Sequence, residues 1–174
     1  MKINYPFDKE KLKELKAGDV VEFSGIIYTA RDAAHLRIEK MLNNNEKLPF
    51  DLNDSFIYYA GPTPTKPGKV VGSIGPTTSS RMDKFAYLMP RLGLVGTIGK
   101  GPRDNECTKY YIDNKILYFI TTGGCGALLA KSVKEAKEIA FLDLGPESVK
   151  KLKVESFKMI VAIDYYGNNI FERK

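Results

Sequence analysis

The feature that most limits the fold of this chain is a repeated joint. In it, an apolar, strand-like segment runs into a polar or glycine-rich turn before the next segment begins. Such joints occur at residues 26–35, 70–83, 95–102 and 121–127. Each joint alone is weak evidence, because tight turns need glycine anyway. Four of them in one chain predict an α/β fold in which strand ends converge on a shared edge, where α/β sheets bind ligands.

The rest of the chain supports one domain over 1–174 with a mixed sheet and packed helices. Its 174 residues are 43% hydrophobic and can bury a core of their own. Runs rich in β-branched and aromatic residues predict strands, and apolar residues at helical spacing predict helices. The strands are expected at 19–23, 25–28, 56–59, 70–73, 94–98, 116–120, 138–141 and 158–164, and the helices at 31–43, at 79–92 and from about 126 to 133.

Two observations bear on the compartment. No apolar run approaches the roughly 18 residues that span a bilayer, and the N-terminus lacks the apolar stretch of a signal peptide. We therefore expect a soluble, cytoplasmic protein with no membrane partner. Cys107 and Cys125 are then expected to be reduced thiols, too few to hold an iron–sulfur cluster or a structural zinc ion, so we expect no metal site in this chain.

Positive charge is concentrated in one stretch. The net charge of the chain is +6, and residues 66–103 hold seven Lys and Arg residues against the single acid Asp83. Glycines and threonines interleave with these cations, which suits a small anionic ligand better than a polyanion. A nucleic-acid site more often shows a broad basic stripe with exposed stacking aromatics, so no nucleic-acid partner is expected.

The first joint places Arg31 and His35 on one helix face, four residues apart. A cation in the first turn opposes the helix dipole, so Arg31 is costly there unless an anion answers it. That anion is either a ligand or the neighbouring Asp32. For His35 the alternatives are a functional role and a partly exposed helix residue bonded to a neighbouring side chain.

The second and third joints offer an anion cradle. Four hydroxyl residues, 77–80, precede Arg81 at a predicted helix start, and Lys100 stands between two glycines. Free backbone N–H groups, hydroxyls and a guanidinium suit a carboxylate or phosphate. Helix capping is the competing interpretation, since Ser80 and Asp83 fit the capping-box spacing, and an exposed Ser/Thr-rich loop is another. The GxxxxGK[ST] spacing of a P-loop is absent.

Four strings together resemble a known family: YTARDAAH at 28–35, YAGPTP at 59–64, GPTTSSRM at 75–82 and GKG at 99–101. They are similar to the β subunit, or C-terminal domain, of the iron–sulfur-dependent class I fumarate hydratases and L-tartrate dehydratases. The likeness covers nearly the whole chain in one order. Cys125 departs from it, since the family more often has a small residue there.

The resemblance implies a swivelling β/β/α domain that works only with an α subunit, in a β homodimer or an α2β2 assembly. The α subunit would hold a 4Fe–4S cluster, whose free iron acts as a Lewis acid on the substrate. Thr77 would be the proton-transfer residue, with a carboxylate of the α subunit as its relay partner. Arg31, Arg81 and Lys100, with Thr78 and His35, would bind the dicarboxylate.

The implied reaction is the interconversion of fumarate and (S)-malate, a step of the tricarboxylic acid cycle. Dehydration of L-tartrate is the alternative. L-tartrate and malate differ by one hydroxyl group, and the shape of the pocket distinguishes between them. Two further classes stay open: a non-catalytic dicarboxylate-binding domain, which would bind without an α subunit, and a nucleic-acid module, whose affinity would depend steeply on salt.

Overall fold

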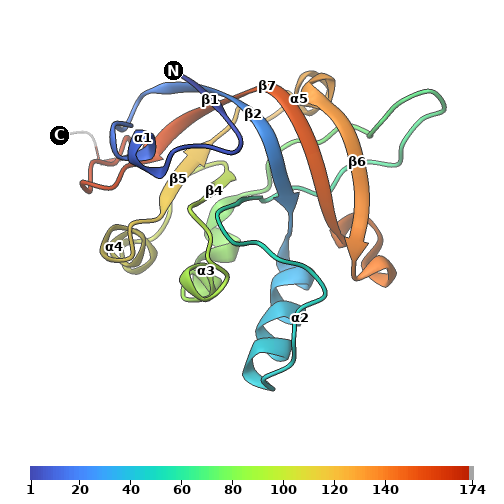
Figure 1. Ribbon diagram of the computed structural model, residues 1–174, viewed down its shortest axis with the longest axis horizontal. Coiled ribbons are helices and arrows are strands. Elements are labelled where there is room, and N and C mark those ends of the chain that lie inside the picture. The colour runs from blue at the N-terminus through green and yellow to red at the C-terminus, as the bar shows by residue number, and fades with distance from the viewer. Residues whose placement is uncertain (173–174) are drawn as a thin grey trace.

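The structure is a computed structural model that describes residues 1–172, and its centre is a mixed sheet that closes on itself (Figure 1). Strands β2 to β5 run parallel to one another, and β7 runs antiparallel to its neighbours. Because β7 pairs with both β5 and β2, five strands form a barrel-like ring. The order in space is β1 (Lys2–Asn4), β2 (Val20–Thr29), β3 (Phe56–Tyr58), β4 (Gly96–Gly99), β5 (Leu117–Ile120), β7 (Val149–Ile163) and β6 (Val133–Ala140).

The long strand β7 has three partners. One of its edges pairs with β2, from Val20 opposite Ile160 to Thr29 opposite Lys150. Its other edge is divided, so that the first part pairs with β6 and the last part with β5. This division lets β6 extend the sheet beyond the ring while β5 closes it.

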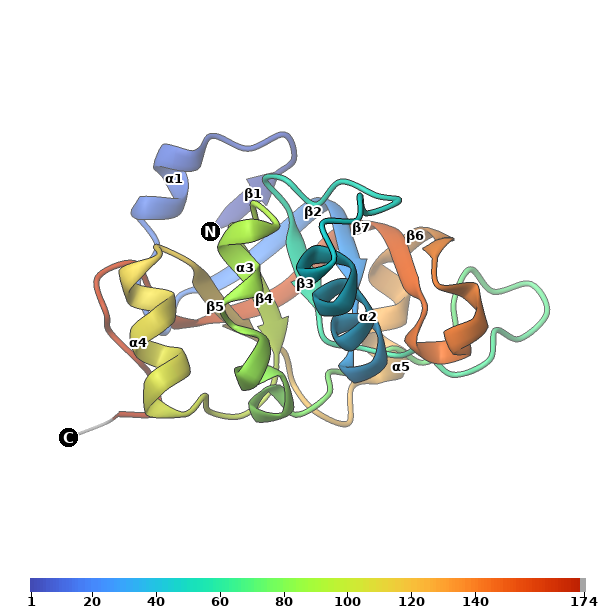
Figure 2. The same cartoon turned by 90° about the horizontal axis from the view of Figure 1, so that it is seen from below.

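Helices provide the connections between the parallel strands. Figure 2 shows α2, α3 and α4 side by side across one face of the sheet. Among residues 1–172, no helix has the length and apolar character needed to cross a membrane. The helices are α1 (Lys9–Lys13), α2 (Asp32–Asn43), α3 (Leu88–Arg91), α4 (Asn105–Asp113) and α5 (Gly126–Ser132), with the 3-10 segments η1 (Ser79–Phe85) and η2 (Leu142–Glu147).

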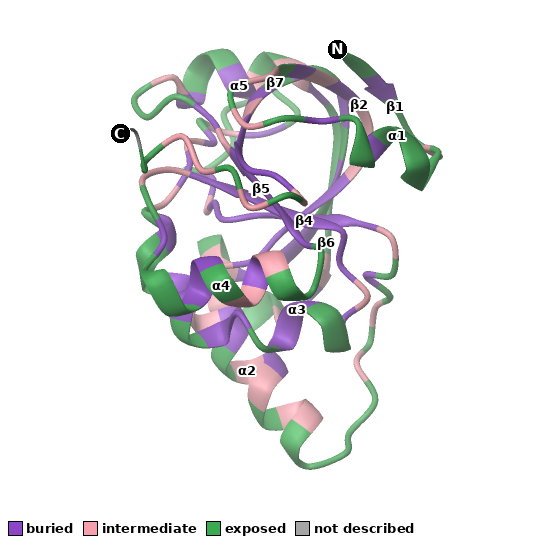
Figure 3. Ribbon diagram, turned by 90° about the vertical axis from the view of Figure 1, so that its left-hand side faces the viewer, coloured by how far each residue is buried: buried purple, intermediate pink, exposed green. Residues whose placement is uncertain are grey.

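Alternation along the strands divides the core in two. Phe56 and Tyr58 of β3, with Phe119 of β5, belong to the cluster inside the ring. Ile57 of β3 and Tyr118 of β5 belong to the second cluster, under the helices. The central strands β3 and β4 are buried along their whole length, whereas Figure 3 shows helices that bury one side and expose the other. The strands β3 and β5, buried on both faces, therefore have apolar or aromatic residues at successive positions.

The expected mixed α/β architecture with packed helices is confirmed, and α2 and α5 begin within a residue of their expected positions. The expected strand at 70–73 is wrong. These residues belong to a long connection, the arm (residues 61–74), which projects from the sheet (Figure 1). Thr63 and Ser73 pair at its base, and Gly68, with φ of 74°, lies at its far turn. The arm is therefore a loop closed at its base.

Other differences concern lengths and missed elements. The expected helix at 79–92 is split into η1 and α3. Strands β6 and β7 begin earlier than expected, because their charged, solvent-facing positions hide the strand pattern. Strand β1 and helices α1 and α4 were not expected. The swivelling character of the domain stays a prediction.

We expect Phe119→Ala to lower the free energy of unfolding by about 3–5 kcal/mol, because it opens a cavity inside the ring. Phe119 is 0% exposed and packs edge to face on Phe56 with ring centroids 5.5 Å apart. Urea denaturation measures the change. Phe171→Ala is the matched control, since Phe171 is 40% exposed and its loss should cost less than about 1 kcal/mol. Equal losses in both variants would contradict a packed interior.

Candidate active site at the carboxyl edge of the sheet

The carboxyl ends of β3 and β4 separate, and the segment 76–79 fits between them. On one side the Thr77 amide donates to the Tyr59 carbonyl at 2.6 Å. On the other side the Ser79 amide donates to the Lys100 carbonyl at 3.0 Å, and Thr78 pairs with Lys100 as a parallel bridge. Thr77 and Thr78 are thus held at the edge where the four parallel strands end.

The remaining joints adjoin the same place. The Gly123 turn lies against the Lys100 side chain, because a Cβ added at Gly123 would lie 3.6 Å from Lys100 Cδ. The Ile74 amide donates to the Gly126 carbonyl at 3.1 Å. The Gly61 backbone passes close to the Arg31 side chain, at 3.2 Å from an added Cβ. The shared edge expected from the four joints is therefore present.

One carboxylate brings the two predicted arginines together. Nε and Nη2 of Arg81 each lie 3.0 Å from Oδ1 of Asp32. Nη2 of Arg31 lies 3.6 Å from the other oxygen of Asp32 and 3.4 Å from Oε1 of Glu147. Glu147 also accepts from the Ala33 amide at 2.8 Å. The acidic neighbours of Arg31 therefore offset the unfavourable interaction of its charge with the helix dipole. The Arg31 and Arg81 guanidiniums lie beside each other, because both pair with Asp32.

The hydroxyls of this segment do not cap a helix. Thr78 is the N-cap of η1 and makes no side-chain capping bond. The proposed capping box is also absent, because Asp83 instead accepts from Arg103 Nε at 2.5 Å and from the Asp104 amide at 2.8 Å. Thr77 is partly exposed at the edge.

His35 lies under the site rather than on it. Its ring is 0% exposed, stacks on Phe85 and meets Tyr59 edge to face. Burial lowers its pKa to about 4. Nδ1 lies 2.8 Å from the Arg31 carbonyl, so the neutral ring donates from Nδ1 and leaves Nε2 without a partner in the described part of the chain. The expectation of a partly exposed histidine is wrong, and its predicted role in substrate binding has no exposed atom to serve it here.

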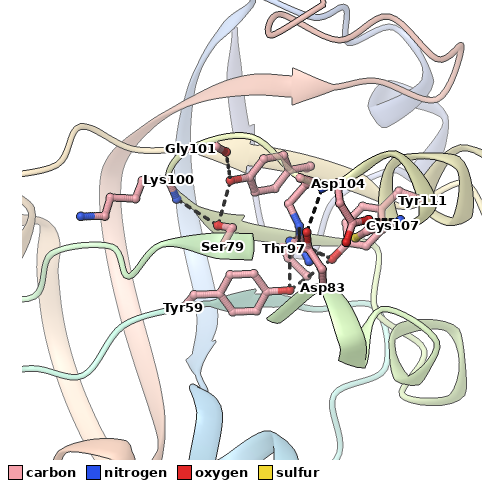
Figure 4. Close-up of polar contacts among 11 residues, drawn as sticks. Tyr59, Ser79, Asp83, Thr97, Lys100, Gly101, Asp104, Cys107 and Tyr111 are labelled. Atoms are coloured by element: carbon pink, nitrogen blue, oxygen red, sulfur yellow. Dashed lines mark hydrogen bonds and ion pairs between the residues drawn. The ribbon is translucent and has the colours of Figure 1, made fainter. Parts of the chain in front are cut away.

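A buried polar cluster supports this edge from below (Figure 4). At its centre the Arg103 guanidinium, 6% exposed, pairs with Asp83. The guanidinium carbon lies 4.9–5.4 Å from the ring centroids of three tyrosines, whose packing adds cation–π attraction. These rings belong to Tyr59, Tyr111 and Tyr118.

Positive charge is less concentrated at the site than the sequence indicates. Arg103 is internal, and Arg81 is paired with Asp32. Arg91 instead bonds residues at the far end of α2. Lys66 and Lys69 lie on the arm. Lys84 lies over the Phe85 ring. Of the seven cations in 66–103, Arg81 and Lys100 are therefore the two that remain at the carboxyl edge.

Neither cysteine is placed to bind iron. Both are free, Cys107 is 3% exposed, and burial raises its pKa to about 12. Across residues 1–172 no group of three or more His, Cys, Asp or Glu side chains could hold a metal ion. The residues present therefore do not fit an iron–sulfur cluster in this chain.

The candidate site is an open edge. Hollows of about 400 and 610 Å³ lie against the arm, and no predicted site residue lines either of them. Arg81 keeps 52% of its side chain exposed. A small ligand at this edge would therefore be covered on one side only.

Several site residues were missed from the sequence. Glu147 reaches Arg31 from a segment 116 positions away, and no local signal marks it. The hydrogen-bond partners of Arg103 lie 8 to 44 positions away along the sequence. Arg103 stands between a proline and Asp104, the N-cap of α4, and a sequence position in such a turn indicates an exposed side chain, so its burial was not predictable. Tyr59 and Tyr118 could have been suspected from their place beside or within apolar strands, whereas Tyr111 lies on α4.

Comparison with known proteins agrees with the resemblance found in the strings. The family model described as "Fumarase C-terminus" matches residues 1–174. A protein of Methanocaldococcus jannaschii named "Putative L(+)-tartrate dehydratase subunit beta" is 48% identical, over 98% of this chain and 92% of its own length.

Two further relatives cover nearly all of this chain. The L(+)-tartrate dehydratase subunit beta of Escherichia coli is 37% identical over 95% of this chain and 83% of its own length. Fumarate hydratase 2 of Leishmania major is 38% identical over 97% of this chain, which spans only 30% of that protein.

The buried His35 predicts a pH-dependent stability. Its pKa in the folded state, about 4, is below the ordinary 6.5, so the unfolded chain takes up a proton first as the pH falls. The free energy of unfolding should therefore fall by about 2 kcal/mol from pH 7 to pH 5. His35→Gln should lose this dependence.

His35 is the one histidine of the sequence, so its ring protons can be followed directly by NMR. We expect the signal to stay constant from pH 8 to pH 5.5. A titration centred near 6.5 would contradict a buried neutral ring.

Proposed function

The chain belongs to the fumarase C-terminus family, and from that premise we propose that it is the β subunit of a hydro-lyase acting on a small dicarboxylate. An α subunit would hold the 4Fe–4S cluster, since the residues of this chain do not fit one. We propose a single swivelling domain over 1–174 that contributes half of the site. What supports the proposal is that the Thr78–Lys100 bridge beside Thr77 and the ion pairs that join Arg31 and Arg81 through Asp32 both lie where the parallel strands end.

Each residue has a role that its placement supports. Arg31 and Arg81 would bind one substrate carboxylate through paired N–H donors, already oriented by Asp32. The Lys100 ammonium would bind the second substrate carboxylate as a point charge. The Thr78 hydroxyl, exposed at the edge, would donate to the same ligand. His35 would act by positioning, because its ring bonds the Arg31 carbonyl.

Thr77 would move the proton at the substrate carbon. An alcohol is a weak base at neutral pH, so its proton must pass to a better base. The described residues around Thr77 offer no carboxylate bonded to its hydroxyl, which leaves that base to the α subunit. The open side of the edge is where such a subunit would dock.

The proposed substrate is fumarate or (S)-malate. L-tartrate is the second candidate, because two of the relatives are named as L(+)-tartrate dehydratase β subunits. The extra or missing hydroxyl would be read by pocket walls that both subunits form.

Reconstitution tests the function. The isolated chain should turn over no dicarboxylate, because it lacks the thiolates for a cluster. Anaerobic co-expression with its α subunit should give a complex that acts on malate and fumarate, assayed beside L-tartrate and a methylated dicarboxylate. Turnover by the chain alone would contradict the half-site. A complex with an intact cluster but no activity on any of them would contradict the hydro-lyase proposal.

Replacement of Thr77 separates chemistry from structure. Thr77→Ala in the complex should lower kcat by roughly 10²–10⁴-fold, the usual effect of positioned acid–base catalysis. The Tm should move by only a few degrees, because the amide that holds the segment remains. Thr77→Ser should restore part of the rate. Ser80→Ala is the control, since Ser80 is an exposed hydroxyl of the same run. Wild-type exchange of the substrate C3 proton in Thr77→Ala would remove Thr77 from the mechanism.

A further inference from the structure

A chain of hydrogen bonds encloses the turn that carries Lys100. The Lys100 amide donates to Oγ of Ser79 at 3.0 Å. Ser79 Oγ lies 2.8 Å from the phenol oxygen of Tyr118, which lies 2.7 Å from the Gly101 carbonyl (Figure 4). This series of hydrogen bonds thus begins at Lys100 and ends at Gly101, the two residues of one turn.

The Tyr118 hydroxyl is the donor at the centre of this series. Its one proton is shared between Ser79 Oγ and the Gly101 carbonyl, which both accept from it. Ser79 Oγ also accepts from the Lys100 amide. Loss of either hydroxyl would leave a buried polar group unpaired, at a cost in free energy.

Close packing leaves these groups little freedom. Ser79 and Tyr118 are both 0% exposed. A Cβ at Gly99 would overlap the Ser79 hydroxyl, so glycine is required for this approach. The Tyr118 ring also rests on the Arg103 guanidinium, 5.1 Å from its centroid. Burial raises the pKa of Tyr118, which keeps the phenol a neutral donor.

The same series of hydrogen bonds joins two parts of the candidate site. Ser79 follows Thr77 and Thr78 in the inserted segment, and its amide donates to the Lys100 carbonyl. The side chain and the backbone of Ser79 therefore both bond Lys100. Tyr118, on β5, fixes the far end of that turn.

We propose that Tyr118 is a positioning residue, whose hydroxyl, through Ser79 and Gly101, holds Lys100 in register with Thr77 for the substrate's second carboxylate. This inference rests on the proposed function for the identity of the ligand. Tyr118 itself touches no substrate. Its contribution is the fixed direction of the Lys100 side chain.

Tyr118→Phe tests the inference against a matched control, Tyr111→Phe. Tyr111 is equally buried in the same cluster, but its hydroxyl bonds Thr97 and Tyr59 and not the Lys100 turn. In the reconstituted complex, Tyr118→Phe should raise the KM for the dicarboxylate about fivefold or more and change kcat less. Tyr111→Phe should keep KM within twofold while lowering Tm comparably. Equal KM effects, or none in Tyr118→Phe, would overturn the proposal.

Amide hydrogen exchange supplies a readout that needs no activity. The Lys100 amide should exchange faster in Tyr118→Phe than in Tyr111→Phe, since only the first opens the chain. Ser79→Ala breaks the same chain from the other side and serves if Tyr118→Phe does not fold. Unchanged exchange at Lys100 would overturn the positioning role. Lack of turnover in the wild-type complex, with faster exchange in Tyr118→Phe, would instead count against the proposed function alone.

Discussion

The antiparallel pairing of β7 with β2 is the contact on which the rest of the structure depends. Without it the parallel strands β2 to β5 would form an open sheet whose two outer edges need cover. With it, the strands close into a ring, and the inside fills with the aromatic side chains of β2, β3 and β5. Closure also fixes the positions of the four parallel carboxyl ends relative to one another. The position of the candidate site is therefore a consequence of how the ring closes.

A second constraint is the burial of Arg103 beneath that edge. Removing a guanidinium from water costs several kcal/mol, which only close partners can offset. Asp83 supplies the charge, and three tyrosine rings surround the cation. An apolar residue could fill this space at similar stability. What the ion pair adds is direction: Asp83 is tied both to Arg103 and to the Asp104 amide, which anchors η1 and with it the start of the Thr77 segment.

An element or site residue can be predicted from the sequence when the interactions that define it act between residues close together along the chain. Local signals predicted α2, α5 and the central strands, because periodicity and turn residues act over a few positions. They failed at 70–73, where Val70 and Val71 read as a strand but Thr63 and Ser73 close a loop. The joints between strands and turns identified four candidate site residues, because strand ends converge on one edge of the sheet. These residues are Arg31, Thr77, Arg81 and Lys100. Glu147 was not identified, because it lies in another segment and meets Arg31 only in the folded chain.

The charges at the edge explain why such a site would be divided between two chains. Arg31 is already paired with Asp32 and Glu147, and Arg81 is paired with Asp32. These ion pairs keep both guanidiniums oriented at little electrostatic cost. Within residues 1–172, Lys100 is then the cation left without an ion pair at this edge. A dicarboxylate brings two negative charges, so this half-site alone neutralises it incompletely. On the proposed function, the missing positive charge and the base for Thr77 come from the same direction, the uncovered side. A subunit docking there would complete charge neutralisation and proton transfer together, and would exclude water, which strengthens each of these interactions.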